Sequence, residues 1–268
     1  MAPCPGVPQG HGPLYGLSTP TLGRGGWSLD AAPMGRFVAG GTAVMIRPMV
    51  SYGLTEDLQL SVSFPLSLYR DEGLPPVRGL TRMPMMRDAQ AMLGWRFHRN
   101  AVSVGTRWES TAWLGFEYPT DDVRAGIETA PGAYAAAVTG YASRSWYVWA
   151  GGAHRRAVGS GLDETRPGDT SMASLVVGYR PAAFRADYPG PDWRGFLELV
   201  GEWMGRDRGA TGTIEESGGR QIFLAATVLG LYGSWGVSGG PALPLHQASN
   251  GVAPRERLRL AINLTFWF

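Results

Sequence analysis

The sequence RLRLAINLTFWF, from Arg257 to Phe268, ends the chain and decides its fold class. Large apolar side chains occupy the even-numbered positions, and mostly polar ones occupy the odd-numbered positions. Because successive side chains of a strand point to opposite faces, this alternation predicts a β-strand with one apolar and one mostly polar face. An exposed apolar edge strand would promote aggregation of a soluble protein. A strand of an outer-membrane β-barrel fits the pattern instead, with lipid outside and the lumen inside.

Segments with the same alternation recur along the chain between turn residues, and twelve can be drawn. The clearest after the last is 58–69, where Leu, Val and Phe alternate with Gln, Ser and Pro. The parity of the sixth and seventh segments stays open, because they contain mainly small and aromatic residues. The segments are expected at 26–37, 42–54, 58–69, 86–98, 106–118, 132–142, 145–155, 171–180, 195–204, 221–232, 235–243 and 257–268.

The links between these segments alternate between short and long. Short links follow even-numbered segments, and longer polar links follow most odd-numbered ones; 38–41 and 181–193 break the rule. The expected fold is therefore an all-β, transmembrane antiparallel up-and-down β-barrel of about 12 strands, with short periplasmic turns and longer extracellular loops. A soluble β-sandwich or lipocalin-like barrel would also alternate, but its outer face would be the polar one.

The amino-acid composition excludes several other classes of protein. The formal charge of +2 is too small to indicate a nucleic-acid partner. No run of about 20 apolar residues offers a transmembrane helix. The single Cys4 excludes an internal disulfide, and together with His11 it makes only a weak metal-binding pair. We expect no metal site and no cofactor.

The first 25 residues differ in composition from the rest of the chain. They are rich in Pro and Gly, and we expect residues 1–25 to form a periplasmic tail or a plug within the lumen, followed by the barrel at 26–268. Leu14, Tyr15 and Leu17 would give such a plug apolar anchors. The start, MAPCPGVPQGHG, has neither the basic region nor the apolar core of a secretory signal, so we expect the signal to be absent from this sequence.

Charged residues of inward parity are the candidate functional residues. Acidic and basic side chains balance, which predicts ion pairs across neighbouring strands in a narrow lumen. Such charges can line a selective pore or hold a plugged barrel shut, and the sequence leaves both open. The lumen-lining candidates are Asp30, Arg36, Arg47, Asp88, Arg96, Arg107, Glu109, Glu117, Arg180, Glu198, Glu202 and Arg259.

Two smaller groups allow other chemistry. Glu198 and Glu202 lie four residues apart on one face of a strand, where they could hold a cation or pair with arginines of adjacent strands. His98, assigned inward, and His154 could serve a Ser/His hydrolase, but no motif places a nucleophile beside them. We therefore expect no catalytic residues and no enzyme activity.

Three stretches carry a family resemblance. They are HGPLYGLSTPTLGRGGWSLD from His11, YGLTEDLQLSVSFP from Tyr52, and ESGGRQIFL from Glu216 followed by GGPALPLHQ from Gly239. Together with the last strand they resemble a family of bacterial outer-membrane proteins known as transporters or as meta-pathway of phenol degradation proteins. The resemblance implies a Gram-negative outer-membrane barrel through which small molecules pass.

These observations give one main functional hypothesis and two alternatives. The chain is expected to be a channel for passive passage of small solutes, hydrophobic or aromatic ones included. The first alternative is a closed scaffold barrel with a protein partner in a membrane complex, and the less favoured one is a hydrolase. Expected partners are outer-membrane lipid, lipopolysaccharide, a small-molecule solute, and the barrel-assembly machinery, which would read Phe266 and Phe268 as its signal.

Overall fold

The computed structural model describes residues 12–71, 89–118, 130–161, 164–184, 190–251 and 255–268. Almost all regular structure in these residues is β, with one 3-10 turn, η2 (Ala182–Phe184). None of their helices is long and apolar enough to cross a membrane. The strands are β1 (Trp27–Val38), β2 (Gly41–Gly53), β3 (Leu58–Ser63), β4 (Leu66–Arg70), β5 (Ala89–Ser103), β6 (Thr106–Tyr118), β7 (Gly132–Ala142), β8 (Trp146–Ala157), β9 (Thr170–Tyr179), β10 (Asp192–Met204), β11 (Arg208–Gly209), β12 (Gly212–Thr213), β13 (Gly219–Tyr232), β14 (Trp235–Ser249) and β15 (Glu256–Trp267).

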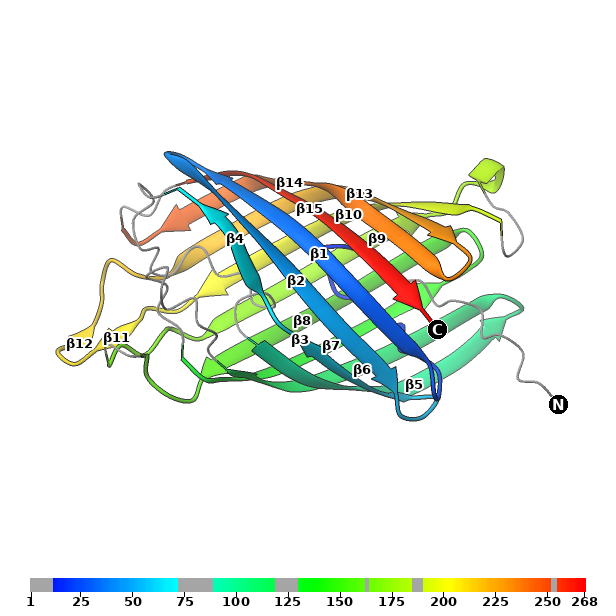
Figure 1. The fold of residues 1–268 in the computed structure, drawn as a ribbon, viewed down its shortest axis with the longest axis horizontal. Helices are drawn as coiled ribbons and strands as arrows, with labels where there is room; N and C mark the ends of the chain where they lie inside the picture. The colour runs from blue at the N-terminus through cyan, green and yellow to red at the C-terminus, as the bar shows by residue number, and fades with distance from the viewer. Residues whose placement is uncertain (1–11, 72–88, 119–129, 162–163, 185–189, 252–254) are drawn as a thin grey trace.

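The main sheet closes on itself into a barrel (Figure 1). Its strands follow the order β1-β15-β14-β13-β10-β9-β8-β7-β6-β5-β3-β2, and β1 pairs with both β2 and β15. The backbone N–H of Trp27 donates to the carbonyl of Phe268 at 2.9 Å, so the first and last strands are joined directly. Because β3 and β4 share one position beside β2, the barrel has 12 strands, all antiparallel, as the sequence predicted.

The third predicted strand is broken. The segment 58–69 was expected to be continuous, but β3 ends at Ser63 and β4 begins at Leu66. The interruption falls at Phe64–Pro65, because proline has no N–H for the strand ladder. The N–H of Phe64 donates instead to the carbonyl of Pro48 at 3.0 Å. Among the described residues, β4 pairs with β2 alone.

The two faces of the wall have opposite character, and they are inverted relative to a soluble protein. Leu114 is 64% exposed and Leu197 53% exposed on the outer face, whereas Glu109 and Glu198 on the inner face are 1% and 0% exposed. The strands are 10 to 15 residues long apart from β3, β4 and the small β11–β12 hairpin. That length suffices for a tilted strand to cross a hydrocarbon layer. The apolar outer face therefore fits lipid.

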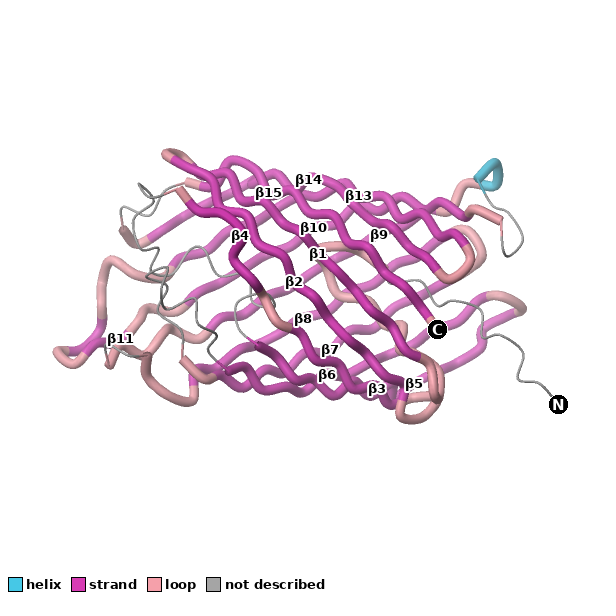
Figure 2. The backbone as a smooth tube through the Cα atoms, in the orientation of Figure 1, coloured by secondary structure: helices cyan, strands magenta, loops and turns pink. Residues whose placement is uncertain are grey.

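Aromatic side chains gather on the outer face at the end of the barrel that carries Trp27 and Phe268. We call this the terminal end, and the opposite one the long-loop end; Figure 2 shows the short turns at the former. Three close ring pairs link neighbouring strands there: Trp27 with Tyr52 at 4.5 Å, Trp146 with Tyr179 at 4.6 Å, and Trp235 with Phe266 at 4.6 Å. Such girdles mark the interface between lipid and water in membrane barrels.

Local bulges shift a few residues from the face that strict alternation predicts. The register of β5 against β6 shifts between Arg96 and His98. His98 was expected to point inward, but it is exposed. The register of β15 against β1 slips beside Arg257, so Arg257 is exposed and Glu256 is buried inside instead. An extra residue in one strand reverses the alternation beyond it.

Candidate functional site: the barrel lumen

The N-terminal segment Gly12–Gly26 runs within the lumen. Its Leu17 N–H donates to Ser174 Oγ of β9 at 3.0 Å, and its Leu22 N–H donates to Gln59 Oε1 of β3 at 2.7 Å. Thr19 lies between them, where its carbonyl accepts a hydrogen bond from Thr111 of β6 at 2.6 Å. The segment thus contacts strands around much of the barrel wall.

Glu198 on β10 is the main attachment point of this segment. The backbone N–H groups of Leu14, Tyr15 and Gly16 all donate to its carboxylate, at 2.9, 2.8 and 2.7 Å. Thr227 of β13 donates a fourth hydrogen bond at 2.5 Å. Three consecutive N–H groups around one anion form a concave binding site for negative charge, here occupied by a side chain of the wall.

Tyr15 attaches the segment to a second strand of the wall, β14, which is separated from β10 by β13. Its hydroxyl donates to the carbonyl of Gly240 on β14 at 2.8 Å. Burial and the neighbouring Glu198 carboxylate raise the pKa of the Tyr15 phenol, so the hydroxyl stays protonated and keeps its role as donor. The Tyr15 side chain is buried.

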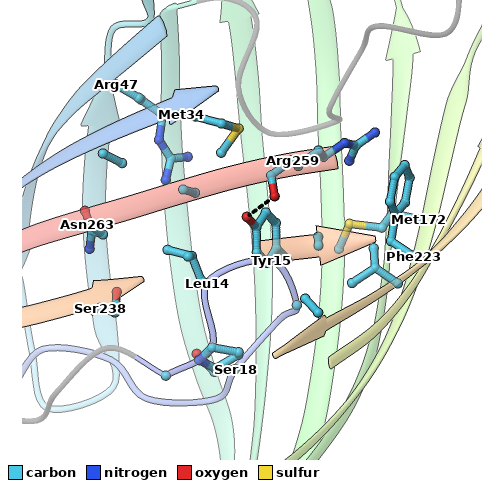
Figure 3. Close-up of a pocket in the computed structure, with 18 of the residues that line it drawn as sticks. Leu14, Tyr15, Ser18, Met34, Arg47, Met172, Phe223, Ser238, Arg259 and Asn263 are labelled. Carbon is cyan, nitrogen blue, oxygen red and sulfur yellow. Dashed lines mark hydrogen bonds between the residues drawn. The ribbon is translucent and has the colours of Figure 1, made fainter. Parts of the chain in front are cut away.

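Two cavities lie beside the segment. The first measures about 160 Å³ and faces Leu14, Tyr15 and Ser18; Figure 3 shows these residues opposite the wall. Its wall combines apolar side chains with two arginines and two carboxylates: Met34, Met172, Phe223, Arg47, Arg259, Asp30 and Glu202. The second cavity measures about 520 Å³ and borders Gly12 and Pro20 of the same segment. The segment therefore borders two separate spaces of the lumen.

Arg259 is the centre of a buried ion-pair network. It contacts Glu202 through two hydrogen bonds, of 2.6 and 2.9 Å, and Glu256 through a contact of 2.5 Å. Glu256 also accepts from Arg36 at 2.6 Å. The Arg259 guanidinium lies 3.8 Å from the ring centre of Phe223, a cation–π contact. Since β10 and β15 are separated by two strands, the pair with Glu202 crosses the lumen rather than joining neighbouring strands.

A second network lies between β5 and β6. Arg96 contacts Glu109 at 3.3 Å and Asp57 at 3.0 Å, and Arg107 lies 3.0 Å from Glu109. Glu117 further along β6 pairs with Arg155 of β8. The inward carboxylates of this wall thus each have an arginine partner, which satisfies charges held away from water.

The structure places eleven of the twelve predicted lumen residues on the inner face or at its terminal end. Asp30 and Arg47 border the first cavity, and Asp30 accepts a hydrogen bond from Thr265 at 2.6 Å. Arg180 pairs with Asp192 at 2.6 Å near the terminal end. Asp88 lies outside the described residues. None of these positions tests a role in solute selectivity, which stays a prediction.

Glu198 and Glu202 do not form a joint cation site. Glu198 binds the N-terminal segment, and Glu202 binds Arg259. No group of three potential metal-ligating side chains occurs among the described residues. The expected pair with an arginine of an adjacent strand is wrong for both residues: Glu202 pairs with Arg259, whose strand is not adjacent, and Glu198 accepts from backbone N–H groups and Thr227.

Several lumen residues escaped sequence analysis. Arg155 was missed because the parity of its strand was ambiguous, and Glu256 because it precedes the strand drawn from the alternation. Ser174 and Thr227 gave no signal, since uncharged polar residues are common on any inner face. The N-terminal contacts could not be predicted from side chains, because the donors to Glu198 are backbone N–H groups.

His98 and His154 lie away from the lumen. His154 is exposed on the outer face of β8, where its Nδ1 is 3.0 Å from Ser171 Oγ on β9. No carboxylate among the described residues is hydrogen-bonded to the His154 ring, so the arrangement lacks an orienting third group there. His98 is also exposed and lies apart on β5.

A closed barrel with an apolar outer face and a charged lumen is the architecture of outer-membrane barrels, and solved structures share it. The COG4313 outer membrane channel from Pseudomonas putida F1 superposes with a TM-score of 0.61 at 15% identity, over 92% of this chain and 97% of that one. The NanC porin superposes with a TM-score of 0.55 at 10% identity, over 89% and 98%. At such identities the likeness establishes the fold. No protein-family model and no curated protein sequence matches the chain.

Proposed function

We propose that this protein is a channel of a bacterial outer membrane for passive passage of small solutes, and that the Gly12–Gly26 segment acts as its plug. The terminal end then faces the periplasm and the long-loop end faces the outside. The observation that carries the proposal is the pair of lumen cavities that the N-terminal segment borders. The likeness of the fold to a channel and a porin supports it.

The segment is attached to the wall mainly by polar contacts, which can break and re-form. The attachment consists mainly of hydrogen bonds to Glu198, Ser174 and Gln59, and of the Tyr15 hydroxyl bond. Each such bond contributes on the order of 1 kcal/mol net, so a few of them hold the segment without fixing it permanently. Small solutes with apolar surface would fit the first cavity, whose wall includes Met34, Met172 and Phe223.

Single-channel conductance in planar bilayers tests the proposal. The intact protein is compared with a variant that lacks residues 2–24, which removes the contacts to Glu198, Ser174 and Gln59. A variant that lacks only residues 2–10 is the control, because it keeps all of these contacts. We expect the 2–24 deletion to conduct in steady steps larger than those of the intact protein, and the control to match the intact protein.

Two outcomes would contradict the proposal. Equal conductance of all three proteins would deny the segment its role as a plug. Silence in all three, with folding established by heat-modifiable gel migration, would exclude an open channel and favour the closed scaffold barrel.

A further inference from the structure

The second cavity lies at the terminal end, and the described residues that line it include three arginines and no acidic side chain. It borders the short turns at Gly105 and Ser143, which places it at the mouth that the proposed function assigns to the periplasm. Arg99 of β5, Arg107 of β6 and Arg194 of β10 line it together with the rings of Tyr147 and Trp149. Its volume of about 520 Å³ lies in the range of small-molecule sites.

The arginines around this mouth outnumber their carboxylate partners. Arg96 and Arg107 share Glu109, and Arg180 and Arg194 share Asp192. Asp57 is the remaining acidic partner, and it contacts Arg96 at 3.0 Å. On β5 and β6, the three guanidinium groups of Arg96, Arg99 and Arg107 face two carboxylates of the described residues, Glu109 and Asp57, so this part of the wall has a positive surplus.

Two of the lining arginines have donors available to a ligand. Arg99 is exposed and has no ion-pair partner in the part of the chain that the structure describes. The Nε–H of Arg107 is buried, and within the same residues it donates no properly aligned hydrogen bond, although it lies 3.0 Å from Glu109. The Arg107 side chain as a whole is 38% exposed, so an anion in the cavity can reach its guanidinium group.

The remainder of the lining combines two aromatic rings with small apolar side chains and three hydroxyl side chains, those of Ser103, Thr106 and Ser143. Trp149 is held by a hydrogen bond from its indole N–H to Thr19 Oγ1 at 3.1 Å, and the Arg194 guanidinium lies 5.3 Å from the Tyr147 ring centre. Ala101 and Ala142 complete this surface. The lining therefore offers guanidinium donors for one end of a ligand and flat apolar surface for its body.

We propose that this cavity binds small organic carboxylates, with the carboxylate at Arg99 and Arg107 and the apolar body against Tyr147 and Trp149. Guanidinium groups match the planar carboxylate with paired N–H donors. The proposal rests on the proposed function only for the direction in which the cavity opens. Binding itself requires no conduction, so the two can fail separately.

Isothermal titration of the full-length protein in detergent micelles tests the site. Benzoate is the probe, and benzamide is its neutral counterpart of nearly equal shape. We expect benzoate to bind and benzamide to bind at least about fivefold more weakly, since hydrogen bonds to a charged acceptor exceed those to a neutral one. Equal binding of the two, or no binding of benzoate, would overturn the proposal.

Variants locate the site. Arg99→Gln should weaken benzoate binding by about fivefold or more, because it removes the charge with no partner in the described wall. Arg194→Gln is a second variant on another strand, expected to act in the same direction. Arg156→Gln, on the exposed outer face of β8, is the matched control and should leave binding unchanged. Loss of benzoate affinity in the control, or none in either lumen variant, would place the binding elsewhere and refute the proposal.

Discussion

At the scale of single residues, the position of the N-terminal segment in the lumen depends on a glycine. Gly16 donates its N–H to Glu198 at 2.7 Å, and a Cβ at this position would lie 2.5 Å from Cγ2 of the buried Val176. No side chain larger than hydrogen fits while the segment keeps this hydrogen bond. The apolar residues of the segment were visible in the sequence, but they did not reveal this backbone contact of Gly16 with Glu198.

Gly16→Ala should loosen the segment without disturbing the barrel. Overpacking of this kind costs roughly 1–3 kcal/mol, so the amides of Leu14 and Leu17 should exchange with solvent about tenfold faster or more. Hydrogen exchange followed by mass spectrometry measures this. Gly195→Ala is the control, because a Cβ there meets nothing within 4 Å. Unchanged exchange in Gly16→Ala would show that the segment tolerates the added methyl group.

Glu256 is the residue on which the buried arginine network depends most. It binds both Arg36 and Arg259, and all three side chains are at most 6% exposed. Glu256→Gln would remove the carboxylate that Arg36 and Arg259 share, and Glu202 would remain as a partner of Arg259. We expect a loss of about 3–5 kcal/mol in the free energy of unfolding, the usual cost of removing one partner of a buried pair. Urea unfolding of the refolded protein, followed by tryptophan fluorescence, measures it.

The same substitution at an exposed ion pair separates the effect of burial from the effect of losing a charge. Glu215 pairs with Arg206 at 2.5 Å, but the two side chains are 69% and 47% exposed. Glu215→Gln should therefore cost less than about 1 kcal/mol, since water screens the pair. Similar losses for both variants would mean that the Arg259 network is hydrated and that its burial contributes little.

At the scale of strands, alternation predicted most of the wall, and local irregularities account for what it missed. Leu260, Ile262 and Leu264 are exposed and Arg259 is buried, as the parity of the last strand requires. The bulge beside Arg257 could not be predicted, because an inserted residue has no sequence signature there. The proline at 65 was visible, yet the outer row of leucines continued across it and favoured one uninterrupted strand.

The sequence also did not predict which charged side chains of the lumen form ion pairs with one another. Balanced charges predicted ion pairs between neighbouring strands, which holds for Arg96 with Glu109 and for Arg36 with Glu256. Arg259 reaches Glu202 on a strand that is not adjacent, because long side chains can span a narrow interior. Parity fixes which face a residue occupies, whereas the curvature of the closed barrel decides which residues meet across it.

The last strand offers a test of the predicted assembly signal. Phe268 is 62% exposed and stacks only loosely on Trp27, at 6.3 Å between ring centres. Phe268→Ala should therefore change the stability of the refolded barrel by less than about 1 kcal/mol. If the residue is read during assembly, the same substitution should lower the amount inserted in cells several-fold, measured by heat-modifiable migration of membrane fractions.

Leu264→Ala serves as the control for that experiment. Leu264 lies on the same strand and the same outer face and is 48% exposed, so its truncation removes similar lipid-facing surface. An equal loss of insertion for Leu264→Ala would mean that apolar surface, and not the terminal aromatic residue, determines assembly.

At the scale of the whole molecule, the pairing that closes the barrel does not involve the N-terminal segment in the lumen. The pairing of β1 with β15 and the hydrogen bonds between Trp27 and Phe268 involve no residue of the N-terminal segment before Gly26. We therefore expect the wall and the segment to be separable parts, with Glu198 as the main contact between them. This separation allows the proposed plug to leave the lumen while the barrel stays folded.

A double-mutant cycle between Glu198 and the segment tests that separation. In the intact chain, Glu198→Gln should lower the free energy of unfolding by about 1–3 kcal/mol, because the charge-assisted bonds from Leu14, Tyr15 and Gly16 weaken. In a chain that lacks residues 2–24 those donors are gone and the carboxylate is hydrated, so the same substitution should change stability by less than about 0.5 kcal/mol. Urea midpoints of the four proteins give the coupling. An equal loss in both backgrounds would show that Glu198 stabilises the wall itself, through Thr227, and would remove the segment's main point of attachment.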